Sequence, residues 1–303
     1  MSTPSRGPQA VRNSVTDHLK RHAKISGEPF NIVKRRFVMS RFLARVFTTD
    51  PQGWILKGGV GMMVRLPESR YSKDIDIMAV SRTSDPIADL RHAVSEHIDE
   101  FRFEIGPAAP LSNGKGSTVT VTARIGVTAF ETFSIDLVEW RRPLVGPVEH
   151  HRIPRIVDTA DFPPETTVQL YPLVDQIADK ICAMYELYGV VAQRSSGRYR
   201  DLVDLLLISM FLPIDLAEAA EAVERERVLR GIRQLPETLI SPGQDWHNGW
   251  TKEARKSPLP AEHHGLEAGL RAAGHCYNRV LSALAATKRS SRWNPERTIW
   301  EDY

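Results

Sequence analysis

The chain has few cysteines and no long apolar run, and each shortage excludes a class of protein. Cys182 and Cys276 are its only cysteines and have no paired spacing, so neither a disulfide framework nor a cysteine-rich zinc site is expected. The longest apolar stretch, residues 205–212, is far shorter than the roughly 20 residues that a membrane-spanning helix needs. The first residues also lack the apolar core of a secretory signal. We therefore expect a cytoplasmic protein.

Two other kinds of site are disfavoured. No serine lies in the Gly-x-Ser-x-Gly turn of a nucleophile elbow, so a hydrolase triad is unsupported. The histidine pairs at 150–151 and 263–264 are adjacent, so their rings point apart on a helix or strand and are not expected to share a metal. The composition, 42% hydrophobic and 25% charged, is that of an ordinary folded chain.

Positive charge is concentrated near the N-terminal end. Residues 1–50 contain ten Lys or Arg and three Asp or Glu, a net charge of +7 that leaves −4 for the rest of the chain. A basic region beside a mildly acidic one suits a polyanionic partner such as RNA. The alternative is a solvated helix surface that binds nothing, and charge alone does not separate the two.

Hydrophobic periodicity predicts an α+β fold with a mixed first half and a helical second half. Strand patterns occur at residues 54–57, 73–80, 117–125 and 132–140, the third entered through a turn at 113–116. Helical spacing predicts two helices within 14–48, broken at 26–29, and others at 60–66, 86–101, 173–187, 199–211, 216–232 and 262–286. Residues 194–197 and 236–260 are predicted to be the most mobile. We therefore predict two domains, residues 1–160 with a mixed sheet and flanking helices, and residues 161–303, all-helical.

Three aspartates are candidates for a metal site. Asp74 and Asp76 lie two apart on a predicted strand, so both carboxylates leave one face, about 6.5–7 Å apart along the chain. Adjacent carboxylates repel unless cations neutralise them, and Mg²⁺ binds one or two carboxylates together with substrate phosphates. Asp136, on a neighbouring predicted strand, would complete a clamp for two metal ions that activates an attacking hydroxyl and holds a leaving pyrophosphate. The alternative is an Asp-x-Asp pair without a catalytic role, which is common on strands.

A glycine pair lies shortly before these acids. Lys57, Gly58 and Gly59 end a predicted strand and open a short helix, where backbone N–H groups can approach a phosphate closely. Alone, the glycine pair is more typical of an ordinary tight turn. Basic residues, Arg70 among them, follow before Asp74, so a phosphate cradle, cations and acids occur within about twenty residues. That combination predicts a binding site for a nucleoside triphosphate.

The helical half contributes a second candidate group. Lys180 lies in the first turns of a predicted helix, and Asp201 opens the next one. A lysine acts on a polyphosphate as a point charge, whereas the guanidinium of Arg200 can bind phosphate oxygens in pairs. The alternative is a purely structural salt bridge between Lys180 and Asp201. Arg141 and Arg142 are expected either to contact acceptor phosphates or to form a solvated rim, and Trp246 and Trp250 to pack within the helical half.

Four short motifs resemble those of the AbiEii/AbiGii toxin family of nucleotidyltransferases, which includes the MenT toxins of type IV-like toxin–antitoxin systems. The motifs are LKGG at 56–59, RYSKDID at 70–76, DKI at 179–181 and RDLVD at 200–204, and the likeness covers roughly residues 30–290. The resemblance implies a polymerase-β-type nucleotidyltransferase domain whose active site is completed by the helical domain. It also implies a nucleoside triphosphate donor, Mg²⁺, a cognate antitoxin protein and, for the MenT branch, transfer of nucleotides to the 3′ end of tRNA.

The resemblance assigns roles to individual residues. It implies that Asp74 and Asp76 bind metal, and that Lys180 and Asp201 are essential residues that contact the triphosphate and shape the acceptor site. The resulting catalytic set is Asp74, Asp76, Asp136, Lys180 and Asp201, and the nucleotide-binding set is Lys57, Gly58, Gly59, Arg70, Ser72, Lys180 and Arg200. Ser72 falls where modification can silence such toxins. Val60 departs from the family, in which Ser, Thr or Ala often follows the glycine pair, so no hydroxyl is available there.

Two alternatives stay open. A nucleotidylyltransferase that modifies a protein or a small molecule would use a similar metal centre. A non-catalytic protein that binds RNA or an antitoxin on the same fold is the other, although the intact acids at 74, 76 and 136 speak against it.

Overall fold

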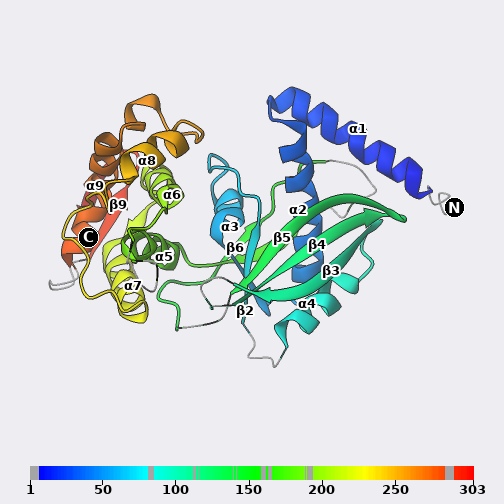
Figure 1. Ribbon diagram of the computed structural model, residues 1–303, viewed down its shortest axis with the longest axis horizontal. Helices are drawn as coiled ribbons and strands as arrows, with labels where there is room; N and C mark the ends of the chain where they lie inside the picture. The colour runs from blue at the N-terminus through cyan, green and yellow to red at the C-terminus, as the bar shows by residue number, and fades with distance from the viewer. Residues whose placement is uncertain are drawn as a thin grey trace. The chain divides into compact units, whose positions relative to one another are not determined.

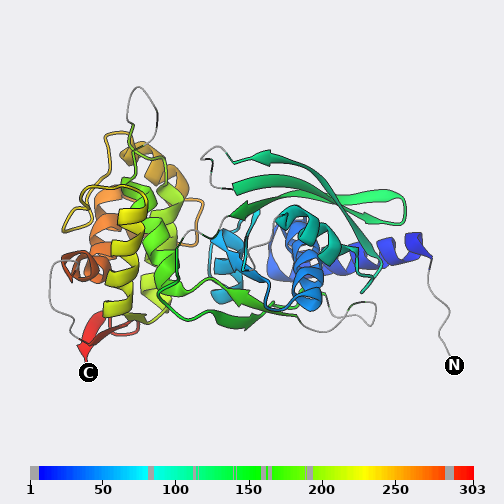
Figure 2. The ribbon, with the colours of Figure 1, turned by 90° about the horizontal axis from the view of Figure 1, so that it is seen from below.

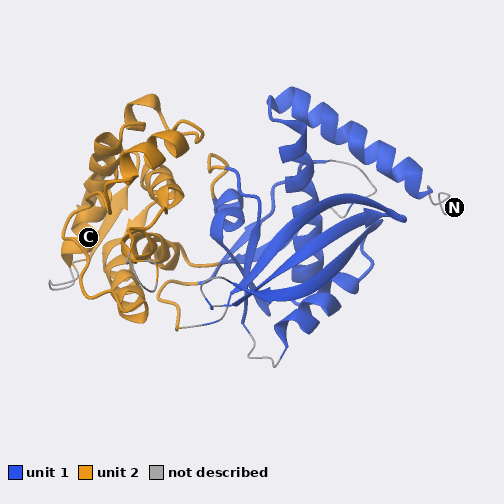
Figure 3. Cartoon of the chain, in the orientation of Figure 1, with its two compact units in different colours: residues 1–65, 71–141, 148–170 blue, residues 66–70, 142–147, 171–303 orange. Residues whose placement is uncertain are grey.

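The computed structural model describes residues 7–80, 85–111, 114, 116–138, 140, 142–157, 162, 166–187, 189, 194–283 and 290–303. The chain forms two units that interleave along the sequence, shown in blue and orange in Figure 3. Unit 1 comprises residues 1–65, 71–141 and 148–170, and unit 2 comprises residues 66–70, 142–147 and 171–303. The sequence suggested one boundary near residue 160. In the structure, two short segments from the first half belong to unit 2.

Unit 1 combines helices with a seven-stranded sheet. Its described helices are α1 (Pro8–Ser26), α2 (Phe30–Thr49), α3 (Gly58–Arg65) and α4 (Pro86–Ser95). Its strands are β1 (Trp54–Lys57), β2 (Ile75–Ala79), β3 (Phe101–Pro110), β4 (Gly116–Ile125), β5 (Thr128–Val138), β6 (Glu149–Arg152) and β7 (Thr167–Leu170). They are ordered β3-β4-β5-β2-β1-β7-β6. The pairs β2–β5 and β1–β7 are parallel and the others antiparallel, so the sheet is mixed and the predicted α+β class is confirmed.

The hydrophobic core of unit 1 lies between the sheet and its helices. In Figure 2, α2 and α4 lie against one face of β3, β4 and β5. Phe42 of α2 packs edge-on against Phe103 and Phe133, with ring centroids 5.4 and 5.6 Å away. Because side chains alternate along a strand, burying this face leaves the intervening residues of β4 and β5 on the opposite face.

Unit 2 is built mainly from helices (Figure 1). These helices enclose buried apolar side chains. Its helices are α5 (Leu173–Tyr185), α6 (Tyr199–Phe211), α7 (Leu216–Leu229), α8 (Trp246–Ala254), α9 (Leu266–Ser282) and the 3₁₀ turn η1 (Ala261–His263). The prediction that this half is all-helical was wrong, because β8 (Ile214–Asp215), β9 (Ser291–Asn294) and β10 (Ile299–Asp302) form a small antiparallel sheet. Trp293 of β9 is buried and donates from Nε1 to the Ser209 carbonyl at 2.7 Å, which ties this sheet to α6.

Several element boundaries differ from the sequence predictions. The helix predicted for 86–101 ends at Ser95, and Phe101 instead begins β3, a strand that was missed. Residues 236–260 were expected to be mobile but contain α8, whose Trp246 and Trp250 are fully buried, as their expected packing role requires. Tertiary packing of these indoles outweighs the weak local helical pattern. No helix in the described part of the chain has the length and hydropathy needed to span a membrane.

Candidate active site

A row of polar side chains crosses four neighbouring strands of unit 1. Lys57 of β1 is opposite Asp76 of β2, and Asp76 is opposite Asp136 of β5. Asp136 is in turn opposite Thr118 of β4. Residues directly opposite on paired strands share a face, with Cβ atoms about 4.5–5.5 Å apart. We call Lys57, Asp76, Asp136 and Thr118 the carboxylate row, because its centre is two adjacent carboxylates.

The alternation of the strands fixes which way this row faces. On β2, Ile75 and Ile77 are fully buried, and on β5, Ile135 is fully buried and Leu137 nearly so. Asp76 and Asp136 lie between these apolar residues and are partly exposed. Slipping either strand by one residue would bury its aspartate and expose its aliphatic side chains, so the hydrophobic core sets the register that brings the carboxylates together.

Asp74 occupies a different position from its two companions. It precedes β2, which begins at Ile75, and its side chain is exposed, so the prediction that Asp74 lies within the strand was wrong by one residue. In the described residues no group of three or more His, Cys, Asp or Glu is arranged as a metal site. What the structure assembles is the pair Asp76 and Asp136. Two carboxylates fit the needs of Mg²⁺, which takes one or two from a protein and completes its shell with water and phosphate oxygens.

The glycine pair lies directly against the carboxylate row. Gly58 has φ +60°, a left-handed conformation that disfavours L side chains, and a Cβ there would collide with the Asp76 carboxylate. A Cβ on Gly59 would collide with the side chain of Ser72. The turn from β1 into α3 therefore needs glycine at both positions, and it places the start of α3 beside Asp76. Helix N-termini favour anions, so this turn is suited to a phosphate group.

Val60 has a structural role. It is buried in the core of unit 1, and the next residue, Gly61, approaches the Leu56 carbonyl so closely that a Cβ would lie 3.3 Å from the oxygen. The first turn of α3 is thus packed through apolar contact at residue 60. Hydrogen bonds to a phosphate at this turn therefore have to come from backbone N–H groups or from neighbouring side chains.

A charged cluster borders the segment that carries Ser72 and Asp74. Lys34 and Arg35 both pair with Glu131, at 3.1 and 3.0 Å. Burial raises the pKa of Tyr71, and the negative charges of Glu131 and Asp74 raise it further, although Arg35 opposes them. The Tyr71 phenol is therefore neutral at physiological pH. It lies close enough to Asp74 to sense that charge.

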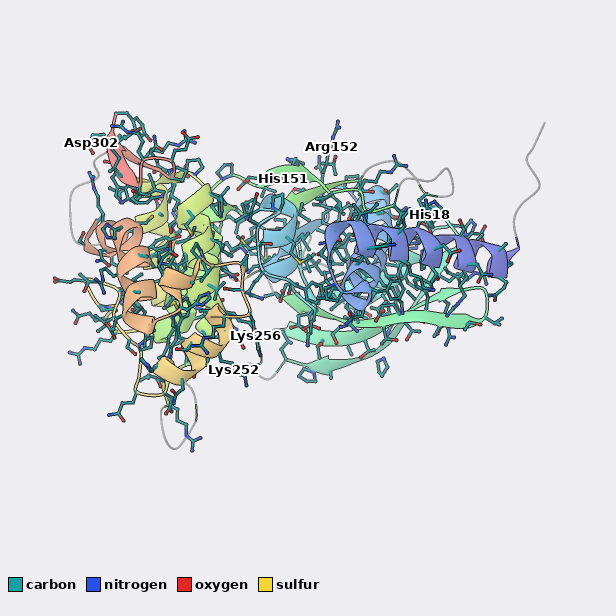
Figure 4. All side chains as sticks on the ribbon, turned by 90° about the horizontal axis from the view of Figure 1, so that it is seen from above. His18, His151, Arg152, Lys252, Lys256 and Asp302 are labelled. Atoms are coloured by element: carbon teal, nitrogen blue, oxygen red, sulfur yellow. The ribbon has the colours of Figure 1, made fainter. Side chains whose placement is uncertain are left out.

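Much of the N-terminal positive charge is already neutralised within unit 1. Arg36 pairs with Glu28 at 2.8 Å, whereas Arg12 donates to the Ala129 carbonyl and has no acidic partner among the described residues. Arg41 and Arg45 are buried with Asp99, at 2.8 and 2.6 Å. The basic residues of α1 that are exposed and have no ion pair with any described residue are Lys20, Arg21 and Lys24. They lie on the same helix as His18, which Figure 4 labels. The basic surface is therefore much smaller than the sequence suggested.

Unit 2 contains a buried ionic cluster around Lys180. Its Nζ lies 2.5 Å from Asp204 Oδ2 and 3.4 Å from Asp201 Oδ1. Arg70 donates from an NH₂ group to Asp204 at 2.9 Å; its Nε is also 2.9 Å from the other oxygen, but without the alignment of a hydrogen bond. Arg198 pairs with Asp201 at 2.6 Å. We call Arg70, Lys180, Arg198, Asp201 and Asp204 the lysine cluster.

The balance of charge in the lysine cluster is uneven. It contains three cations and two carboxylates, and Lys180, Asp201 and Asp204 are 6%, 3% and 1% exposed. The structural alternative considered for Lys180 and Asp201 is thus present as a real ion pair. Each carboxylate also has an arginine of its own, so Lys180 supplies the surplus positive charge. A surplus charge at a buried site suits an anionic ligand.

Two other predicted phosphate contacts are engaged elsewhere. The side chain of Arg200 is 61% exposed and pairs with Glu253 of α8 at 3.1 Å. Arg142 is mostly buried between Asp175 and Glu226, at 2.5 and 2.9 Å, so the expected solvated rim was wrong at this residue. Burial lowers the pKa of Arg142, but Tyr171, Glu226 and Asp175 together hold it above its ordinary value. Arg141, Asn113 and Lys115 lie outside the described residues.

Sequence reasoning missed two members of these groups. Asp204 stands three residues after Asp201 on α6, and that spacing puts both carboxylates on one helix face, a signal that was present in the RDLVD motif. Thr118 had no comparable signal. Its place beside Asp136 depends on the β4–β5 register, which no local pattern specifies.

The family comparison shows the class of this protein, a nucleotidyltransferase of the toxin class. The family described as nucleotidyl transferase AbiEii toxin, type IV toxin–antitoxin system, matches residues 41–272, which is more than half of the chain. The chain belongs to this AbiEii family. The predicted family resemblance is thereby confirmed, and with it the assignment to a transferase family. No curated protein matches the chain.

Solved structures with a similar fold include two bacterial proteins. One is MenT4, a nucleotidyltransferase toxin from Mycobacterium tuberculosis H37Rv, which is 18% identical with a TM-score of 0.49; the match covers 89% of this chain and 98% of MenT4. The other is JHP933 from Helicobacter pylori, 12% identical with a TM-score of 0.45, covering 84% of this chain and 93% of JHP933. Identities this low say nothing about substrates.

Proposed function

We propose that the protein transfers a nucleotide from a nucleoside triphosphate to the 3′ end of tRNA, releases pyrophosphate and thereby blocks translation. The observation that carries this proposal is the carboxylate row beside the Gly58–Gly59 turn in a chain of the AbiEii family. Phosphoryl transfer needs little covalent participation from the protein, so positioning and charge neutralisation suffice for catalysis.

Each part of unit 1 has a task in this reaction. Asp76 and Asp136, with Asp74, would hold Mg²⁺, which supplies neutralisation of the triphosphate and a lowered pKa for the attacking hydroxyl. The turn at Gly58 and Gly59 binds phosphate oxygens through backbone N–H groups, and Lys57 adds positive charge at the end of the row. Asp136 orients the acceptor 3′-hydroxyl, with Thr118 beside it on β4. Within unit 2, the surplus charge of the lysine cluster suits a polyphosphate, which is the role proposed for Lys180.

A polyanionic acceptor is supported by the exposed basic residues of α1. Lys20, Arg21 and Lys24 are exposed and have no ion pair with any described acid. Contacts of this kind with phosphates supply sequence-independent affinity that weakens as salt rises. The choice of tRNA over other RNA rests on the family resemblance.

A cognate antitoxin is the proposed partner, in keeping with the type IV toxin–antitoxin family. Ser72 offers one route of control, because its side chain packs against Gly59 beside the carboxylate row. A phosphoryl group on Ser72 would add negative charge there and crowd the glycine turn. Mass spectrometry of protein rescued by the antitoxin would detect the modification, and Ser72 found always unmodified would leave only rescue through a complex.

The test is a labelling assay. Purified protein is incubated with total tRNA, Mg²⁺ and each labelled nucleoside triphosphate in turn, alongside Asp76→Asn and a control, Asp89→Asn, which removes an exposed acid of α4. We expect labelled tRNA with the native protein and the control, and none with Asp76→Asn. Oxidising the terminal ribose of the tRNA with periodate should abolish labelling if the acceptor is the 3′ end. Equal labelling by Asp76→Asn would reject the proposal.

The alternatives give different outcomes in the same experiment. Label that migrates with protein or with a small molecule would favour a nucleotidylyltransferase with another acceptor. If no label is transferred and Mg²⁺ with any triphosphate fails to raise the melting temperature, a non-catalytic binding role is favoured, because a ligand selective for the native state must stabilise it.

A further inference from the structure

Unit 1 contains a buried excess of positive charge away from the carboxylate row. Arg41 and Arg45 of α2 share one carboxylate, Asp99, and all three side chains are at least nine-tenths buried. Asp99 accepts from Arg41 Nε at 2.8 Å, from Arg45 at 2.6 and 3.3 Å, and from the Phe101 amide at 2.9 Å. Two guanidinium groups thus face one saturated carboxylate.

Arg45 makes more hydrogen bonds than Arg41, although its own Nε is also buried without an acceptor among the described residues. Arg45 also donates to the carbonyls of Asp99 and Phe101, at 3.2 and 2.7 Å. Arg41 makes a single hydrogen bond through Nε, and one of its terminal NH₂ groups is buried without any acceptor among the described residues. A buried, unpaired donor on a charged group carries a large desolvation penalty. The site is therefore incomplete as it stands.

A small cavity adjoins this unpaired group. It measures about 30 Å³ and is lined by Arg41, Arg155, Ser40 and Thr166 together with Phe37 and Phe162. The Arg41 guanidinium lies over the Phe162 ring, 5.5 Å from its centroid, so the arginine faces one wall of the cavity. One water needs about 10–15 Å³, and pockets for drug-sized ligands measure about 300–1,000 Å³. The cavity is thus large enough for a small ion and far too small for a nucleoside.

We infer that this cavity is a binding site for a phosphate-sized oxyanion, held by Arg41 and Arg155. The anion would accept from the unpaired Arg41 NH₂ group and balance the positive charge that Asp99 leaves uncompensated. Burial lowers the pKa of Arg41, and the neighbouring charges of Arg45 and Arg155 lower it further while Asp99 opposes them. A bound anion would relieve that repulsion.

The cavity is separate from the proposed catalytic centre. Phe133 of β5 packs against α2, and Asp136 is three residues further along the same strand, so it points to the opposite face. The inferred site therefore lies on the helix-covered face of the sheet, and its variants leave the carboxylate row intact. Its occupant could be free phosphate or a phosphate of an RNA backbone, since both present the same oxygens.

The test is a phosphate titration followed by thermal unfolding, in chloride buffers of matched ionic strength and without divalent cations. The variants are Arg41→Gln and Arg155→Gln, and the control is Arg152→Gln, which removes an exposed arginine of β6 that projects outward in Figure 4. We expect phosphate at about ten times its Kd to raise the Tm of the native protein by about 2–5 °C. Arg155→Gln should raise the Kd about tenfold, Arg41→Gln should abolish the response, and Arg152→Gln should leave it unchanged.

Basal differences in Tm among the variants do not affect this readout, because each protein is compared with itself with and without phosphate. No response in the native protein would overturn the inference, as would responses equal in all variants or a loss in Arg152→Gln as large as in Arg155→Gln. A short RNA without terminal phosphates separates the two sources. Displacement of this RNA by phosphate, with weaker RNA binding in Arg41→Gln and Arg155→Gln but not in Arg152→Gln, assigns the site to the backbone. Phosphate binding without displacement assigns it to the free anion.

Discussion

The carboxylate row of unit 1 and the lysine cluster of unit 2 use the same kinds of residue in opposite ways. In the row, Asp76 and Asp136 stand side by side on neighbouring strands and are partly exposed. In the cluster, Asp201 and Asp204 are almost fully buried, and each is paired with Lys180 and with an arginine. In the function that we propose, the accessible like charges of the row bind a cation and a substrate. The opposite charges of the cluster neutralise one another in the interior and leave Lys180 as the surplus positive charge.

The difference matters for interpreting variants. Removing one partner of a buried ion pair costs about 3–5 kcal/mol, enough to unfold part of a marginally stable protein. Loss of activity in a variant of the lysine cluster therefore does not by itself show a catalytic role. For Asp76 and Asp136, which are partly exposed, we predict little loss of stability, so lost activity in a variant that stays folded would indicate a catalytic role.

The largest effect is expected for Asp76→Asn. Losing one central carboxylate should lower the rate of nucleotide transfer by about 10²–10³-fold or more, the size seen when a key electrostatic group is removed from an active site. The free energy of unfolding should change by less than about 1 kcal/mol, because Asp76 is partly exposed and its loss relieves the repulsion with the neighbouring carboxylate of Asp136. Parallel kinetic and urea-unfolding measurements check this. A large loss of stability in Asp76→Asn would remove the contrast between the two regions.

Within the lysine cluster, removing a carboxylate should destabilise the protein more than removing the lysine. Asp204→Asn leaves Arg70 and Lys180 without their shared carboxylate and should destabilise the protein by about 3–5 kcal/mol. Lys180→Met leaves both arginine–aspartate pairs intact and should cost only about 1–2 kcal/mol. Urea unfolding of both variants gives the comparison. A stable Lys180→Met protein with lost transfer would place Lys180 on the substrate, and equal destabilisation by the two variants would contradict the assigned surplus charge.

The turn at Gly58 and Gly59 should tolerate very few substitutions. Gly58→Ala forces an L residue into a left-handed conformation, at a cost of about 1–2 kcal/mol, and drives its Cβ into the Asp76 carboxylate. We expect transfer to fall at least about tenfold while the fold survives. Gly231→Ala is the matched control, because Gly231 also has positive φ but has open space around its Cβ position. If both variants lose activity equally, backbone strain rather than the Asp76 contact is the cause.

The smallest predicted effect is a pH dependence at Glu131. Burial raises the pKa of this carboxyl, but hydrogen bonds from Arg35 and Lys34 outweigh burial and hold the pKa below its ordinary value. A depressed folded-state pKa contributes stability above the unfolded-state pKa of about 4.3, and the contribution is lost as pH falls through the folded value. Glu131→Gln should therefore be less stable than the native protein by about 0.5–1 kcal/mol at pH 7, with the difference shrinking as pH falls below about 4.3 and on through the folded-state pKa. A difference that grows on acidification would reverse the sign and contradict this account.

Strong local patterns in the sequence were enough to predict many elements. Helix α6 was placed at residues 199–211 as observed, and the strands that carry Asp76 and Asp136 were recognised from their alternation. That these two strands are neighbours was also predicted and is confirmed by their pairing. What local pattern could not give was register. The positions of Lys57 and Thr118 in the row depend on how four strands align through their buried faces.

Charge and composition were weaker guides than periodicity. The +7 of the first fifty residues suggested a broad basic surface, yet Arg41 and Arg45 are buried with Asp99, and several other cations pair within unit 1. Similarly, β9 and β10 were missed because a four-residue hairpin strand stabilised by Trp293 has almost no local signature. Both the pairing of these cations and the formation of the β9–β10 hairpin depend on contacts between residues distant in the chain. A short window of sequence does not contain that information.

The account depends most directly on where a divalent cation binds. A crystal structure with Mn²⁺ and a non-hydrolysable nucleoside triphosphate would locate the ion by its anomalous scattering. We predict the strongest peak between the Asp76 and Asp136 carboxylates, with triphosphate oxygens completing its coordination and the phosphates at the Gly58–Gly59 turn. A triphosphate bound with its cation elsewhere in the molecule, and the two aspartates left without an ion, would contradict the central claim.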